Sequence, residues 1–151
     1  GNYSLEDTFS EVTTPNARGA IRFVGANSDA LRATNSAGDI NGDGHTDILI
    51  GAPGNSTGGT SAGAAYLVYG GPSHFGNWWD ASTGEPQAEI LLDAAVTAGT
   101  SAARFVSSTT NENLGHSVDR LGDINGDGFD DLIIGASPAG GTVRLFFGGG
   151  S

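Results

Sequence analysis

A sixteen-residue stretch occurs twice in this chain, and the second copy lies 84 residues after the first. The first copy reads GDINGDGHTDILIGAP and spans residues 38–53, and the second reads GDINGDGFDDLIIGAS and spans residues 122–137. Eleven of the sixteen positions are identical. Each copy places an acidic loop directly before an apolar run. The chain therefore contains two related structural units.

Short apolar segments separated by polar turns surround both copies. Such segments, in a chain with 26 glycines, favour strands and tight turns over helices. The ILI and LII cores do not alternate with polar residues, which predicts that both faces of these two strands are covered. The sequence predicts an all-β fold of two four-stranded antiparallel propeller-type blades, forming a partial or self-assembling β-propeller. The expected strands are Ile21–Gly25, Ala30–Ala37, Asp47–Gly51, Ala64–Gly70, Ala103–Ser107, His116–Leu121, Asp131–Gly135 and Thr142–Gly148.

The repeat divides the chain into three parts. Residues 1–19 are a polar lead-in, residues 20–102 form the first unit with a long connecting loop at 72–99, and residues 103–151 form the second unit. Within the connecting loop, Ala88–Val96 fits either a strand or a short helix. The first expected strand resembles the last strand of a blade. We therefore expect it to complete the final blade of its own chain or of a neighbouring copy.

Composition limits the classes of function. The chain has no cysteine, which excludes disulfides, thiolate zinc sites and cysteine nucleophiles. Its net charge of −11 disfavours nucleic acids and anionic membrane surfaces as partners, because both carry negative charge. No apolar run approaches the length of a membrane span. An acidic surface of this kind does attract cations.

The repeated acidic loop has oxygen-bearing side chains at alternate positions. Counted from the first aspartate, positions 1, 3, 5 and 9 are predicted side-chain ligands of Ca²⁺, and position 7 is predicted to give its backbone carbonyl. Glycine at position 6 permits a sharp bend. The two predicted calcium sites are Asp39, Asn41, Asp43, His45 and Asp47, and Asp123, Asn125, Asp127, Phe129 and Asp131.

Two features define the type of loop. Position 12 is Ile50 or Ile134 rather than the bidentate glutamate of an EF-hand, so each loop joins two strands instead of two helices. No soft ligand suits zinc, and the many oxygens favour Ca²⁺ over Mg²⁺. The alternative is a turn rich in aspartate, asparagine and glycine that binds no metal. Two copies that keep every ligand position argue against that alternative.

These residues resemble FG-GAP repeats, the blade units of integrin α-subunit propellers and of many bacterial secreted proteins. The resemblance is carried by GDINGDGHTDILIGAP with GAAYLVYGG, and by LGHSVDRLGDINGDGFDDLIIGAS with GTVRLFFGGG. It implies that each loop binds Ca²⁺ between the first two strands of a blade, through the ten residues named above. It also implies an extracellular or cell-surface location. Propellers of that family close with more blades than this chain contains.

We therefore expect a calcium-binding, non-catalytic extracellular β module that acts in adhesion or as a structural or display repeat. Its expected partners are calcium, a protein or glycan ligand, and either further copies of the chain or neighbouring blades. The alternative is a glycan- or substrate-targeting accessory domain of a secreted hydrolase, which would use Trp78 and Trp79. Catalysis has no support, because adjacent strand residues such as His116 and Ser117 face opposite sides. Asp119 and Asp130 are expected to be surface charges.

Overall fold

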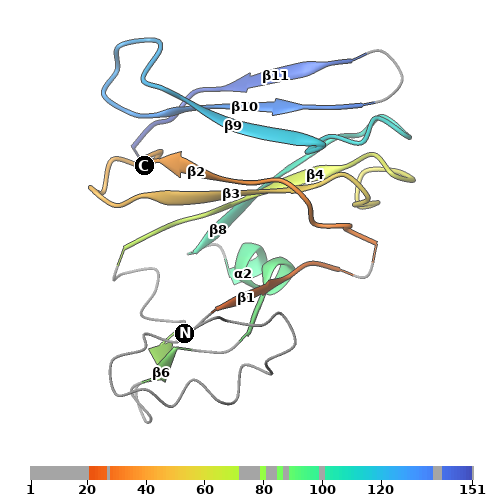
Figure 1. The fold of residues 1–151 in the computed structure, drawn as a ribbon, viewed down its shortest axis with the longest axis horizontal. Coiled ribbons are helices and arrows are strands. Elements are labelled where there is room, and N and C mark those ends of the chain that lie inside the picture. The colour runs from red at the N-terminus through yellow and green to blue at the C-terminus, as the bar shows by residue number, and fades with distance from the viewer. Residues whose placement is uncertain are drawn as a thin grey trace, which may run out of the picture.

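A computed structural model describes residues 21–26, 28–71, 79–80, 85–86, 89–98, 101–137 and 141–150. These residues form two antiparallel β-sheets stacked face to face, with a helix and a parallel strand pair on the far side of the first sheet (Figure 1). The all-β fold is confirmed. The predicted lead-in, Trp78, and parts of the connecting loop lie outside the described residues.

The first sheet has the four strands expected of a blade. Its order is β2 (Thr34–Gly38), β3 (Asp47–Ala52), β4 (Ala64–Val68) and β8 (Ala102–Val106), and every neighbouring pair is antiparallel. The sequence pattern predicts β8 at the start of the second unit, but β8 pairs with β4. The sequence repeat and the sheet are therefore out of step by one strand.

The second sheet has three strands among the described residues. Its order is β11 (Val143–Phe146), β10 (Asp131–Gly135) and β9 (Ser117–Gly122), again antiparallel. Four strands were expected in this unit as well. Within the described part of the chain, no strand pairs with the outer edge of β11.

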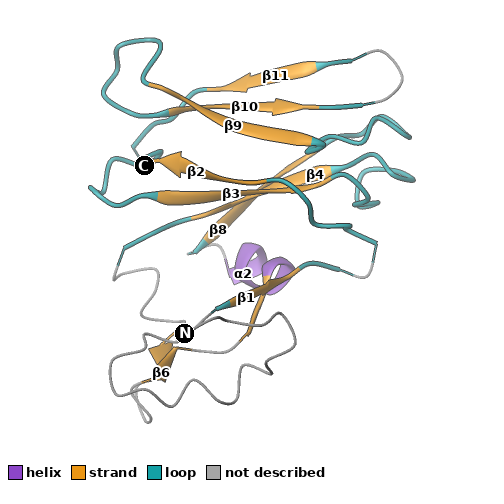
Figure 2. Cartoon of the chain, in the orientation of Figure 1, coloured by secondary structure: helices purple, strands orange, loops and turns teal. Residues whose placement is uncertain are grey.

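The remaining elements lie against the first sheet. Strand β1 (Arg22–Val24) pairs in parallel with β7 (Glu89–Leu91), and helix α2 (Leu92–Ala98) follows β7 directly (Figure 2). The described part of the Ala88–Val96 segment, which begins at residue 89, is thus part strand and part helix. The expectation that β1 would complete the final blade of its own chain is wrong, because β1 pairs with β7. Two further short strands, β5 (Trp79–Asp80) and β6 (Glu85–Pro86), pair with each other.

Alternating side chains of the first sheet enter two separate apolar clusters. Leu49 points into the cluster between the two sheets, which includes Leu67, Leu132 and Ile134. Ile50, its neighbour in β3, belongs to the other cluster. That cluster lies between the first sheet and the β1, β7 and α2 elements. The first sheet is therefore covered on both faces, as its ILI core predicted.

The second sheet is covered on one face only. Leu132 and Ile134 are buried against the first sheet, while Ile133 lies on the opposite face and is partly exposed. Leu145 pairs directly with Ile133 and is 43% exposed. Val143 and Phe147 lie two residues before and two residues after Leu145, and they are 62% and 59% exposed. The prediction of cover on both faces is wrong for this strand.

The described residues include one helix, which is seven residues long. None of the described helical structure is long and apolar enough to cross a membrane.

Candidate metal centres in the acidic loops

The first acidic loop turns from β2 into β3 and folds its polar side chains onto its own backbone. Asp39 accepts hydrogen bonds from the N–H of Asp43 (3.0 Å, Oδ1) and of Gly44 (2.9 Å, Oδ2). The Asn41 Oδ1 accepts from the same Asp43 N–H at 3.1 Å. Gly44 has a φ of 83°, which only glycine adopts without strain. Side-chain oxygens from positions 1 and 3 therefore converge on one backbone amide.

The second loop repeats this arrangement between β9 and β10. Asp123 accepts from the N–H of Asp127 (3.1 Å, Oδ1) and of Gly128 (2.8 Å, Oδ2), and Asn125 Oδ1 accepts from Asp127 N–H at 3.0 Å. The Gly128 N–H contributes most to lowering the pKa of Asp123, since hydrogen bonds to a carboxylate favour its charged form. Both loops thus have the same hydrogen-bond frame.

Position 9 has a different environment from the other positions. Asp47 and Asp131 are fully buried, whereas Asp43 and Asp127 are exposed. Asp47 accepts from the N–H of Ile40 (3.0 Å) and of Gly70 (2.8 Å), which ties the start of the loop to the chain that leaves β4. This carboxylate therefore holds the loop closed as well as being a predicted ligand.

The same tie exists in the second loop. Asp131 accepts from the N–H of Ile124 (2.9 Å) and of Gly148 (3.0 Å), which joins the start of that loop to the chain leaving β11.

Burial raises the pKa of Asp47, its two backbone hydrogen bonds lower it, and repulsion from Asp43 and Asp39 raises it further. The negative charges of the first loop are therefore close enough to repel one another.

The two position-7 residues lie in different surroundings. His45 donates its backbone N–H to Asp43 (2.9 Å) and is exposed. Phe129 donates its N–H to Asp127 (3.0 Å), and its ring lies against the first loop. A Cβ atom at Gly42 would come within 2.4 Å of that ring, so Gly42 leaves the space that Phe129 occupies.

Comparison with known proteins agrees with this repeated geometry. The model of the FG-GAP repeat family matches residues 32–68 and 115–146, one copy on each sheet. The chain belongs to the FG-GAP repeat family. Integrin alpha-PS3 of Drosophila melanogaster is 34% identical over 113 residues, which are 74% of this chain and 8% of that integrin. The chain thus spans a small part of the length of this relative.

The first FG-GAP match ends before the strand that completes the first sheet. The first match ends at the last residue of β4 and omits β8, which completes the first sheet. Sequence reasoning assigned β8 to the second unit because its ARFV motif matches the IRFV of β1. Pairing partners, unlike strand composition, could not be read from that motif.

The donor set of both FG-GAP loops is chemically suited to a hard cation, because it consists of carboxylate and amide oxygens. Within the described residues, however, no three Asp, Glu, His or Cys side chains are gathered closely enough to form a ready-made metal site. Asn41 Nδ2 instead donates to Asp43 Oδ2 at 3.1 Å, and Asn125 to Asp127 at 2.8 Å. The calcium ligands therefore stay a prediction from the sequence.

Asp130 links the two loops, a role that sequence reasoning missed. Its Oδ2 accepts the N–H of Asp39 at 2.8 Å, and its own N–H donates to the carbonyl of Asp39 at 3.1 Å. Arg120 lies 3.6 Å from its other oxygen. The expectation of a plain surface charge is wrong for this residue. The sequence does contain one signal for this role, because the equivalent position in the first repeat is Thr46 and not an acid.

Proposed function

We propose that this chain is a calcium-binding, non-catalytic FG-GAP module of an extracellular protein, acting in adhesion or as a structural and display repeat. The observation that carries the proposal is the set of loop hydrogen bonds that both loops share, from positions 5 and 6 to position 1 and from position 5 to position 3. Each loop turns the oxygens of positions 1, 3 and 5 toward its own backbone, at the same place in its sheet. The resemblance to an integrin α subunit supports the extracellular location.

Calcium would relieve a specific electrostatic cost. Each loop carries three predicted carboxylate ligands, and in the first loop burial, together with smaller contributions from repulsion by Asp43 and Asp39, raises the pKa of Asp47. A bound Ca²⁺ reduces the charge of three carboxylates from −3 to −1. Carboxylate oxygens have several lone pairs, so they can accept backbone N–H groups and bind a cation together. Extracellular calcium modules typically have dissociation constants of about 10⁻⁴–10⁻³ M.

Calcium in the loops would also stiffen the contact between the two sheets. Asp39 is both a predicted ligand and a backbone partner of Asp130 from the second loop. The Gly149 N–H donates to the carbonyl of Ile40 at 2.9 Å, which adds a second tie at the same end of the sheets. We therefore propose a structural role for calcium at this junction.

Isothermal titration with CaCl₂ tests the calcium proposal. We expect two sites in the natural chain and one in each of the variants Asp43→Ala and Asp127→Ala, because each variant loses the position-5 carboxylate of one loop. Asp119→Ala removes an equally exposed carboxylate outside the loops and serves as the matched control. Two sites remaining in both loop variants would refute the ligand assignment.

We propose a further FG-GAP sheet as the partner of the exposed face of the second sheet. This face contains Ile133. The equivalent residue in the first repeat is Leu49, which lies on the face of the first sheet that the second sheet covers. A further FG-GAP sheet stacked here would contribute apolar residues equivalent to Leu132 and Ile134, which the second sheet packs against the first. A second copy of this chain does not offer such a face, because β1, β7 and α2 cover its Ile48 and Ile50.

Light scattering distinguishes a further sheet from a second copy. We expect the natural chain and the variant Leu145→Glu to be monomers alike, with the variant binding less of a dye specific for apolar surface. A natural chain that dimerises, together with a monomeric variant, would show instead that this face pairs with another copy.

The alternative of a glycan-targeting accessory domain receives no support from the comparisons. Of its two proposed tryptophans, Trp78 lies outside the described residues, and for Trp79 only the backbone in β5 is described.

A further inference from the structure

An open pocket of about 310 Å³ lies at the end of the two sheets opposite the acidic loops. It lies where β3 and β10 end and β9 begins, whereas the acidic loops lie at the other ends of these strands (Figure 1). Its volume falls at the small end of the range typical of ligand sites. Residues from four separate segments line it: Ala30, Arg32, Pro53, Gly54, Asn113, His116 and Ser137.

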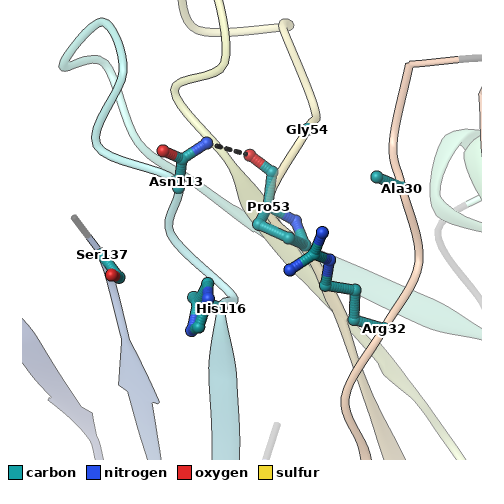
Figure 3. A pocket seen from close by; sticks show the side chains of 7 residues that line it. All are labelled: Ala30, Arg32, Pro53, Gly54, Asn113, His116 and Ser137. Carbon is teal, nitrogen blue, oxygen red and sulfur yellow. Dashed lines mark hydrogen bonds between the residues drawn. The ribbon is translucent and has the colours of Figure 1, made fainter.

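This pocket lacks acidic side chains, although the chain has a net charge of −11. Figure 3 shows Arg32 reaching along Pro53 on one side of the pocket, with His116 and Ser137 on the other. Ion pairs among the described residues engage three arginines: Arg104, Arg120 and Arg144. Within that part of the chain, none engages Arg32. The pocket therefore presents an uncompensated guanidinium beside neutral hydrogen-bonding groups.

The walls of this pocket are held in place by hydrogen bonds. Asn113 donates its side-chain N–H to the carbonyl of Pro53 at 3.0 Å and its backbone N–H to Ser61 at 3.1 Å. Gly54 donates to the carbonyl of Asp29 at 3.0 Å. These bonds join the first sheet to the segment that leads into the second. A ligand would meet a site that is already formed, which limits the entropic cost of binding.

Two left-handed backbone conformations occur in the same place, and the one at Ala30 is strained. Ala30 has a φ of 49° and Asn113 a φ of 55°, two of the four described non-glycine residues with positive φ. Alanine rarely adopts this conformation, because its Cβ approaches the following carbonyl oxygen. Strained residues of this kind cluster at binding sites, where the surrounding structure holds them. This observation is independent of the charge of the pocket.

We propose that this pocket binds a single carboxylate group, with the Arg32 guanidinium as the principal contact and His116 and Ser137 as hydrogen-bonding partners. A guanidinium matches the two oxygens of a carboxylate with two parallel N–H donors. One positive charge balances one carboxylate. A dianionic phosphate would keep surplus negative charge and meet the repulsion of the acidic chain. The small volume fits a short acidic side chain or a chain terminus.

Nuclear magnetic resonance titration of the folded chain tests this proposal, with the His116 imidazole as the reporter. The probes are N-acetyl-aspartyl amide for an acidic side chain, N-acetyl-alanine for a terminal carboxylate, N-acetyl-alanyl amide as the neutral control, and inorganic sulfate. We expect saturable shifts with one or both carboxylates and none with the neutral amide. The two carboxylate probes show which source of the group fits the pocket. Sulfate binding without carboxylate binding would overturn the proposal.

Variants assign the contact to Arg32. We expect Arg32→Gln to weaken carboxylate binding about tenfold or more, and Arg32→Lys to weaken it less, because lysine keeps the charge but loses the planar fork. Arg22→Gln removes an exposed arginine from β1 and is the matched control. Equal binding by Arg32→Gln and Arg22→Gln would also overturn the proposal. Because Arg32 is exposed and distant from the acidic loops, neither result depends on calcium binding.

Discussion

The two sheets of this protein have nearly the same loop and central strand but different surroundings. In the first sheet, Leu49 and Ile50 are both buried, one on each face. In the second sheet, Ile134 is buried while Ile133 is partly exposed. The difference arises from position in the stack, because the first sheet lies between the second sheet, which covers Leu49, and the β1, β7 and α2 elements, which cover Ile50. A repeat sequence therefore specifies its strand, while the elements stacked on each side of the sheet decide how much of that strand is buried.

The largest expected difference concerns the equivalent residues Leu49 and Ile133. Leu49→Ala should lower the free energy of unfolding by about 3–5 kcal/mol, because it leaves a cavity in the core between the sheets. Ile133→Ala should lower it by only about 1–2 kcal/mol, because the side chain is already partly in water. Urea unfolding of both variants measures the difference. Equal losses would show that the two faces are covered alike in solution.

The second expected effect concerns a buried polar group in β4, the third strand of the first sheet. Tyr66 is fully buried, and its hydroxyl donates to Asp29 at 2.7 Å and lies 2.9 Å from Asp93, which anchors α2 to the sheet. We expect Tyr66→Phe to cost about 2 kcal/mol, because the buried carboxylate of Asp29 loses a donor. Thermal unfolding followed by circular dichroism measures this. A loss below that of an exposed control such as Thr34→Ala would contradict it.

The contact between the loops distinguishes Asp130 from its repeat equivalent, Thr46. Asp130→Ala should destabilise the chain by about 1–2 kcal/mol, because the N–H of Asp39 loses a charged acceptor. Thr46 is exposed, so Thr46→Ala should change stability by no more than about 0.5 kcal/mol. Urea unfolding without added calcium separates this effect from metal binding. A harmless Asp130→Ala would refute the link between the loops.

The smallest effect concerns the acid that anchors the second sheet. Hydrogen bonds from Ser107 and Thr142, followed by Arg144, lower the pKa of Glu112 from 4.5 to about 2. A lowered pKa means that the folded state favours the charged carboxylate. This contribution is therefore complete above pH 4.5 and is lost as the pH falls toward 2. Relative to Glu112→Gln, the natural chain should be more stable near neutral pH, and this advantage should disappear near pH 2. An advantage that did not change with pH would contradict this assignment.

Much of the fold was accessible from the sequence, because it depends on local patterns. The apolar runs at β3 and β10 and the turns at the acidic loops follow from residue type and spacing. The pairing of β8 with β4 and of β1 with β7 was not accessible, since ARFV and IRFV look alike as strands. Their partners are decided by contacts across the whole chain.

The candidate site also has features that local sequence patterns predict and features that depend on contacts across the chain. The predicted positions of the loop ligands rest on the alternation of oxygen-bearing residues, but the buried hydrogen bonds of Asp47 and Asp131 could not be read from it. These ties depend on Gly70 and Gly148, which lie 23 and 17 residues further along the chain. The link through Asp130 depends on the stacking of the two sheets. The pocket at Arg32 likewise brings together segments that no sequence motif connects.

The most direct test of the central claim is a calcium titration that observes each loop separately. The backbone amides of Gly44 and Gly128 each donate to the first aspartate of their own loop, so both should respond to an ion bound there. Followed by ¹H–¹⁵N correlation spectra, both amides should shift in a saturable way and return to their starting positions when EDTA is added. If neither amide moves at millimolar calcium, the loops are hydrogen-bonded turns and not calcium sites.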